Sequence, residues 1–139
     1  MACSIYRGFA LIEILIVIGI MTVIGLSVFV GVQSYERSLL FREKNLVFAL
    51  LSEARGRSFL GYPAGLRATP IEYIYFFGDS YDSALRTESY KRESAIKNNI
   101  VDDIIFDNGE NSGREIIFSL GEEKSLRASI NIQKNGRMF

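Results

Sequence analysis

The sequence predicts an α+β protein in which one long N-terminal helix packs on a C-terminal antiparallel β-sheet. The first half of this helix is expected to span a membrane, because the run from Phe9 to Val32 is apolar except for Glu13. The second half is expected to be amphipathic, because its apolar residues recur at helical spacing. Beyond Gly61 the spacing changes to the two-residue alternation of strands.

We divide the chain of 139 residues into four segments. Residues 1–8 form a short leader with one basic residue, Arg7, and residues 9–32 form the transmembrane half of the helix. Residues 33–61 form its amphipathic half, and residues 62–139 form the β-sheet domain. At about 1.5 Å per residue, the second segment measures roughly 36 Å, which is enough to cross a hydrocarbon core of ~30 Å. The sequence therefore predicts a single-pass anchor on a small domain.

Composition excludes several classes of function. The 16 basic and 16 acidic residues balance to a formal charge of zero, which gives no global electrostatic reason to bind nucleic acid or anionic lipid. Histidine is absent, and the single cysteine, Cys3, lies in the leader. Without the leader, the chain has no side chain for disulfides, Cys- or His-based zinc sites or Cys- or His-based catalysis. We therefore expect no cofactor and no enzymatic activity.

Glu13 is the exceptional residue of the apolar run. An ionised carboxylate at the centre of a bilayer costs about 2.5–3.5 kcal/mol on insertion scales, so a functional partner is expected for it. Glu13 lies four residues after Phe9, about one helical turn. A cut between Gly8 and Phe9 would place a new amino group at the apolar edge, where it could neutralise a carboxylate. The alternative is an ordinary anchor whose acid lies near the lipid headgroups, helped by the helix N-terminus.

The segment Gly8-Phe9-x-Leu11-Ile12-Glu13-x-Leu15-Ile16-Val17 resembles the class III signal of type IV pilins and type II secretion pseudopilins. This resemblance implies cleavage at Gly8-Phe9 by a prepilin peptidase, methylation of the new terminal Phe9, and a role for Glu13 in filament assembly. The implied assembly contact joins Glu13 to the N-terminal amine of a neighbouring subunit.

The same resemblance implies a location in the inner membrane, with the C-terminal domain outside the cytoplasm, and then in an extracytoplasmic filament. The implied partners are copies of the chain, other pilins or pseudopilins, the inner-membrane assembly platform and, before assembly, membrane lipid. A different reading is a single-pass anchored domain that binds a ligand or envelope partner and never polymerises.

The amphipathic half should end at about Leu60, before Gly61-Tyr62-Pro63. A second apolar stripe, Phe41, Phe48 and Phe59, could contact neighbouring subunits or add to the core, and the sequence leaves both open. The face expected to dock the sheet consists of Leu39, Leu40, Leu46, Val47, Leu50, Leu51 and Ala54.

Strands are expected from alternation and β-branched or aromatic content. Asn135-Gly136 is expected to be a two-residue hairpin turn into a short last strand. The expected strands are 71–77, 87–93 as a polar edge strand, 100–107, 114–120, 126–134 and 137–139. The layout of helix and strands is also similar to that of the H-type minor pseudopilins. Two short matches support this similarity: Glu53-Ala54-Arg55, and Ile130-Asn131-Ile132 followed by Asn135-Gly136-Arg137.

The predicted loops contain side chains that suit two binding functions, calcium binding and DNA binding. Acidic side chains could supply oxygen ligands for calcium, although their spacing fits no known calcium loop: Asp79, Asp82, Asp102, Asp103, Asp107 and Glu110. The basic and aromatic segment 86–97 could contact DNA through Tyr90, Lys91, Arg92 and Lys97, but Glu88 and Glu93 dilute its charge, so we do not expect DNA as a partner.

Overall fold

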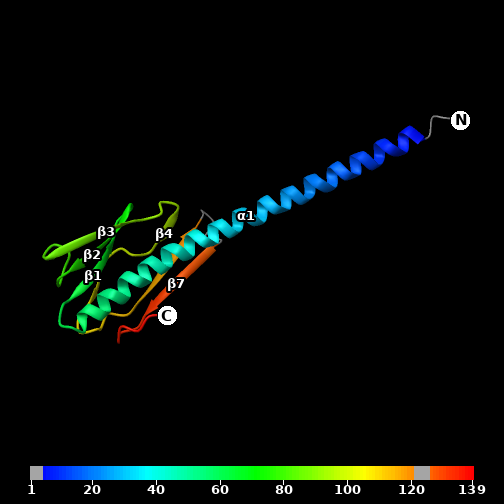
Figure 1. Ribbon diagram of the computed structural model, residues 1–139. Coiled ribbons are helices and arrows are strands. Elements are labelled where there is room, and N and C mark those ends of the chain that lie inside the picture. Colours follow the sequence, from blue (N-terminus) through cyan, green and yellow to red (C-terminus); the bar gives the residue numbers. More distant parts are fainter. Residues whose placement is uncertain (1–4, 121–125) are drawn as a thin grey trace. The chain divides into compact units, whose positions relative to one another are not determined.

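The computed structural model describes residues 5–120 and 126–139, with side chains from Leu11 onward. The first four residues of the predicted leader lie outside this range. The chain divides into two compact units, Met1–Glu36 and Arg37–Phe139. The elements, in chain order (Figure 1), are α1 (Ile5–Ser58), β1 (Ala64–Ala68), β2 (Glu72–Phe77), β3 (Arg86–Lys91), β4 (Ile96–Asn98), β5 (Ile104–Phe106), β6 (Arg114–Leu120) and β7 (Leu126–Ile132).

The α+β prediction is confirmed, with one difference in the sheet. The strands form two antiparallel sheets, one ordered β3-β2-β1-β5 and the other β4-β6-β7. The polar strand expected at 87–93 is present as β3 and lies at an edge, as predicted. The strand expected at 100–107 is shorter, because only 104–106 pairs with β1. Both sheets contribute side chains to one hydrophobic core with α1.

Two strands were not predicted. β1 contains alanine and glycine, which have low β propensity, yet it is central in its sheet. Packing explains its position: a Cβ on Gly65 would lie 2.5 Å from Cζ of Phe76 and 2.7 Å from the carbonyl oxygen of Ile104. Glycine therefore lets the neighbouring strand and an aromatic ring approach closely. β4 is only three residues long, too short for a periodic signal.

Residues 37–58 of α1 bury the face that the sequence assigned to the sheet. Leu39 and Leu46 are half-buried, and Leu40, Val47, Leu50, Leu51 and Ala54 are at most 4 % exposed. The second stripe is not part of the core, because Phe41, Phe48 and Phe59 are 54 %, 37 % and 61 % exposed. Of the two alternatives for this stripe, additional core burial is therefore wrong.

The end of α1 agrees with the Gly61 stop signal. Gly61 has a φ of +82°, its N–H donates to the carbonyl of Ser58, and the N–H of Tyr62 donates to the carbonyl of Arg57. These two bonds form a Schellman cap with glycine in the left-handed position. Pro63 then follows, and β1 begins at Ala64.

The expected two-residue turn at Asn135-Gly136 is wrong in its geometry. The N–H of Gly136 donates to the carbonyl of Gln133, and the N–H of Gln133 donates to the carbonyl of Arg137. The loop therefore has three residues, with Gly136 at a φ of +72° closing it as a bulge. The last strand is a single bridge between Ile132 and Met138.

A two-residue turn does form at Asn108-Gly109. Both residues have positive φ, 50° and 78°, and Asp107 and Glu110 exchange backbone hydrogen bonds of 3.1 and 2.8 Å. These values are typical of a type I′ turn. The N–H of Gly109 also donates to Oγ of Ser58, which fixes this turn against the end of α1.

Candidate functional site

The first unit presents the apolar part of α1. Its described side chains from Leu11 to Val32 are all exposed to the surroundings of the helix. Within the described residues, α1 is the one helix long and apolar enough to cross a membrane, and its most apolar window has no part buried by protein. The structure therefore supports a candidate single-pass anchor.

Glu13 lies on this helix among aliphatic side chains. It lines a shallow groove with Ile14, Val17 and Ile18. Among side chains from Leu11 onward, none forms a hydrogen bond or ion pair with its carboxylate. Gly8 and Phe9 lie in α1, and their side chains are outside the described residues.

Other polar atoms of the same segment are satisfied within the helix. The hydroxyl of Thr22 donates to the carbonyl of Ile18, and that of Ser27 donates to the carbonyl of Val23, both at 2.8 Å. Such local bonds remove the cost of an unpaired hydroxyl in hydrocarbon. Glu13 differs from them, since a carboxylate has no backbone donor to reach inside a helix.

The second unit contains a buried carboxylate that sequence reasoning missed. Glu43 is only 3 % exposed, and its Oε1 accepts a hydrogen bond of 3.4 Å from the N–H of Glu93. Its spacing in the sequence indicates this burial, because Glu43 lies three residues after Leu40 and four before Val47, on the core face of the helix. Burial, followed by the charge of Glu43, raises the pKa of Tyr73.

Tyr73 connects this carboxylate to the strands. Nδ2 of Asn98 donates to its hydroxyl at 2.8 Å, and Arg92 lies 5.9 Å above its ring. Arg92 donates to the carbonyls of Thr69 and Ile96, both at 2.8 Å. These contacts tie the segment between β3 and β4 to the sheet that contains Tyr73.

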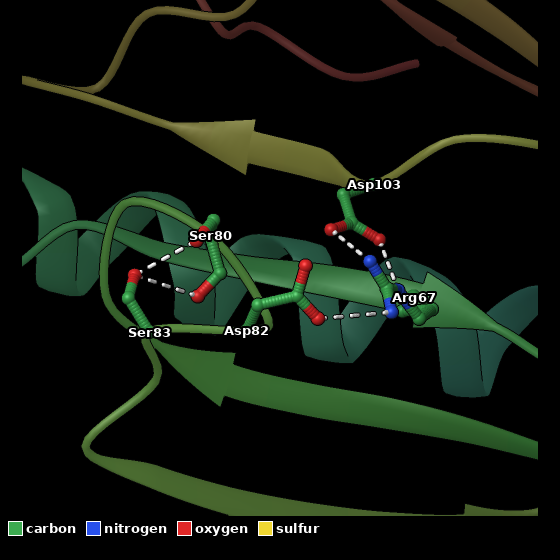
Figure 2. A network of polar contacts seen from close by, with 5 residues as sticks. All are labelled: Arg67, Ser80, Asp82, Ser83 and Asp103. Atoms are coloured by element: carbon green, nitrogen blue, oxygen red, sulfur yellow. Dashed lines mark hydrogen bonds and ion pairs between the residues drawn. The ribbon is translucent and has the colours of Figure 1, made fainter.

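Arg67 contacts two of the six acidic residues that could supply calcium ligands, Asp82 and Asp103 (Figure 2). Its Nε and Nη2 donate to the two oxygens of Asp103 at 2.6 and 2.8 Å, and Nη1 lies 3.9 Å from Asp82. Its guanidinium also lies 4.1 Å from the ring centroid of Tyr81. These carboxylates raise the pKa of Arg67. Arg67 thus occupies the place that a cation would need between Asp82 and Asp103.

The other acidic residues do not converge. Asp102 lies 3.9 Å from Arg114, and Asp107 and Glu110 flank the type I′ turn. Within residues 11–120 and 126–139, no three acidic side chains come together in a way that could hold a metal ion. The structure gives no support for calcium in this part of the chain.

The basic segment weighed for DNA binding is largely committed to internal contacts. Arg86 pairs with Glu88 at 2.7 Å, and Glu93 pairs with Arg42 at 3.1 Å. Both terminal nitrogens of Arg92 donate hydrogen bonds to backbone carbonyls. Lys91 and Lys97 remain exposed.

Comparison with protein-family models, with curated proteins and with solved structures finds no match to this chain. The residues themselves carry the functional information. The most specific pattern is the segment from Gly8 to Val17, where Gly8, Phe9 and Glu13 lie on an apolar helix.

Proposed function

We propose that the chain is a structural subunit of a filament of the type IV pilus or type II secretion class, either a pilin or a minor pseudopilin, processed at Gly8-Phe9. The observation that carries this proposal is Glu13, a carboxylate on an apolar helix with no partner among the described side chains. A group that costs several kcal/mol in lipid calls for a function.

The proposed mechanism is charge neutralisation between subunits. Cleavage after Gly8 creates a cationic amine on Phe9, which is then methylated by the same peptidase. That amine pairs with Glu13 of a neighbouring subunit. The attraction between the two charges offsets part of their desolvation cost, and the apolar side chains of the helix exchange lipid for neighbouring helices.

The anchor supports a location in a membrane, and the inner membrane and the orientation are taken from the resemblance. Before assembly, the chain lies in the inner membrane with its C-terminal domain outside the cytoplasm; afterwards, it lies in the filament. The exposed stripe Phe41, Phe48 and Phe59 supports a role in contacts with other subunits, since these rings have no place in the core. The peptidase and the inner-membrane assembly platform are the further partners of this proposal.

The experiment uses the full chain expressed with a prepilin peptidase and the assembly machinery. Mass spectrometry of the purified protein should show loss of residues 1–8 and one methyl group on Phe9. Glu13→Gln and Glu13→Ala should be cleaved normally, yet form at least tenfold fewer filaments. Glu36→Gln is the matched control, because it removes an acid of the same helix outside the apolar run.

Two outcomes would refute the proposal. Normal filament yield from both Glu13 variants would remove the pairing role. An intact N-terminus in cells with an active peptidase would favour the other candidate, a single-pass anchored binding domain that does not polymerise. The Glu43 and Arg67 clusters of the second unit would then become the places to look for its ligand.

A further inference from the structure

We infer that the outer face of the sheet β4-β6-β7 carries a binding site for a phosphate group, formed by Lys97, Ser119 and Arg127. These residues come from three different strands and are paired directly in register: Lys97 with Ser119, and Ser119 with Arg127. They therefore lie in one row across the sheet. Their neighbours Phe118 and Leu120 are buried, so the row faces away from the core.

The row borders a hollow of about 250 Å³. Its described lining consists of Lys97, Asn98, Asn99, Ile117, Ser119 and Arg127, none of which is acidic. Neighbouring strands are about 4.8 Å apart, so the backbones of Lys97 and Arg127 are separated by roughly 10 Å. Both side chains are long enough to reach an anion held above Ser119.

The donors available for a ligand can be identified from the contacts of the hollow. Both asparagine amides are used internally: Asn98 donates to Tyr73, and Asn99 bonds to the backbone of Glu115 and Ile117. Within residues 11–120 and 126–139, the Lys97 ammonium, the Ser119 hydroxyl and the Arg127 guanidinium form no hydrogen bond. This set of two cations and one hydroxyl is complementary to the oxygens of phosphate.

Arg127 differs from the other arginines on strands. Arg67, Arg86 and Arg114 each lie within 4 Å of a carboxylate. Arg127 has no such partner in residues 11–120 and 126–139. Glu115, the acid of β6 on the same face, lies opposite Asn131 in the strand register. Together with Arg127 it lines an adjacent hollow, and it does not line this one. Among the described residues, two positive charges therefore border one hollow without a carboxylate between them, and an anion would stabilise them.

The site lies only partly within the basic segment 86–97. That segment contains Lys97 but not Arg127, which is 30 positions further along the chain. The sheet register brings them together, and it leaves Lys91, Arg86 and Arg92 elsewhere. The ligand class is a phosphate group, either inorganic phosphate or the phosphomonoester of a headgroup-like molecule.

The test is a titration of the full chain, isotope-labelled and held in maltoside micelles that contain no phosphate, at low salt. Inorganic phosphate should give saturable shifts in the NMR signals of Lys97, Ser119 and Arg127. The double variant Lys97→Gln/Arg127→Gln should weaken this binding by about tenfold or more, because two charge-assisted contacts are lost.

The control is Lys134→Gln/Arg137→Gln, which removes the same charge from exposed positions of the terminal hairpin. It should change the affinity for phosphate less than about twofold. Glycerol phosphate, titrated in parallel, distinguishes the source: tighter binding than inorganic phosphate indicates an organic monoester, and weaker binding indicates free phosphate.

The inference is overturned by any of three results. Shifts that do not saturate, an equal response to chloride, or an equal loss in both double variants would show only general attraction of anions to positive charge. Unchanged signals from the rest of the sheet show that the variants remain folded, so a loss of binding is assigned to the row itself. Filament formation does not enter this experiment, and the proposed function stands or falls separately.

Discussion

Replacing Gly136 with alanine should destabilise the second unit more than the same replacement at Gly61 or Gly113, which also have positive φ. A Cβ on Gly136 would overlap the carbonyl oxygen of Gly109 and lie 2.8 Å from Nε of Arg55. That carbonyl cannot move alone, because Gly109 is held by its type I′ turn and by Ser58. Relief requires the terminal hairpin to move away from α1, with loss of the bond from Arg55 to Asn135.

The magnitude follows from two terms. A φ of +72° costs an alanine about 1 kcal/mol relative to glycine. Overpacking against a fixed backbone atom costs a further ~1–3 kcal/mol. We therefore expect Gly136→Ala to lower the free energy of unfolding by about 2–4 kcal/mol.

Two glycines serve as controls for the backbone term. Gly61 has a φ of +82° and open space around it, and Gly113 has a φ of +75° with a flexible lysine side chain as its nearest neighbour. Gly61→Ala and Gly113→Ala should each cost about 1 kcal/mol.

The assay is denaturant unfolding of the full chain in micelles, followed by near-UV circular dichroism of tyrosine, since Tyr73 and Tyr75 are buried. A loss for Gly136→Ala within about 0.5 kcal/mol of the loss for Gly61→Ala would refute the steric argument.

Three further predictions use the same unfolding measurement. Glu43→Ala should cost about 1–3 kcal/mol, because it removes a buried side chain and leaves the N–H of Glu93 without its acceptor, and a neutral result would show that the carboxylate is not part of the core. Arg67→Lys should cost about 1 kcal/mol through loss of the two-pronged contact with Asp103, whereas Arg86→Lys, at an exposed pair, should cost almost nothing; equal effects would contradict this difference. Burial, followed by the charge of Glu53, raises the pKa of Tyr75 from 10.0 to about 12, so its contribution to stability is complete below pH 10 and is lost as the pH rises to 12. We expect a loss of about 3 kcal/mol over this range that Tyr75→Phe removes, and tyrosinate absorbance at pH 10 that is present in the wild type and missing in Tyr75→Phe would contradict it.

The long helix and the strands β6 and β7 could be predicted because each has a continuous periodic pattern. Ile116, Phe118 and Leu120 are buried on one face of β6, as expected, and Ile130 and Ile132 are buried on β7. Such patterns report directly which face meets the core. The apolar run with Glu13 could be predicted for the same reason, because hydropathy depends on the sequence alone and not on tertiary contacts.

The features that were missed depend on contacts between distant segments. β1 approaches the ring of Phe76 closely because Gly65 has no side chain, and the carboxylate of Glu43 accepts from a backbone donor 50 positions away. The row of Lys97, Ser119 and Arg127 depends on the register of three strands, which the sequence does not specify. Pairing decides these features, and a single sequence carries little information on pairing.

The edge strand β3 bears on how the chain avoids uncontrolled association between sheets. It offers one side of its backbone without a partner strand among the described residues, and such an edge can pair with another chain. Its charged residues Arg86, Glu88 and Lys91 make parallel, in-register stacking of identical edges electrostatically unfavourable, because each charge would meet another of the same sign. Amyloid-like association through this edge is thereby disfavoured.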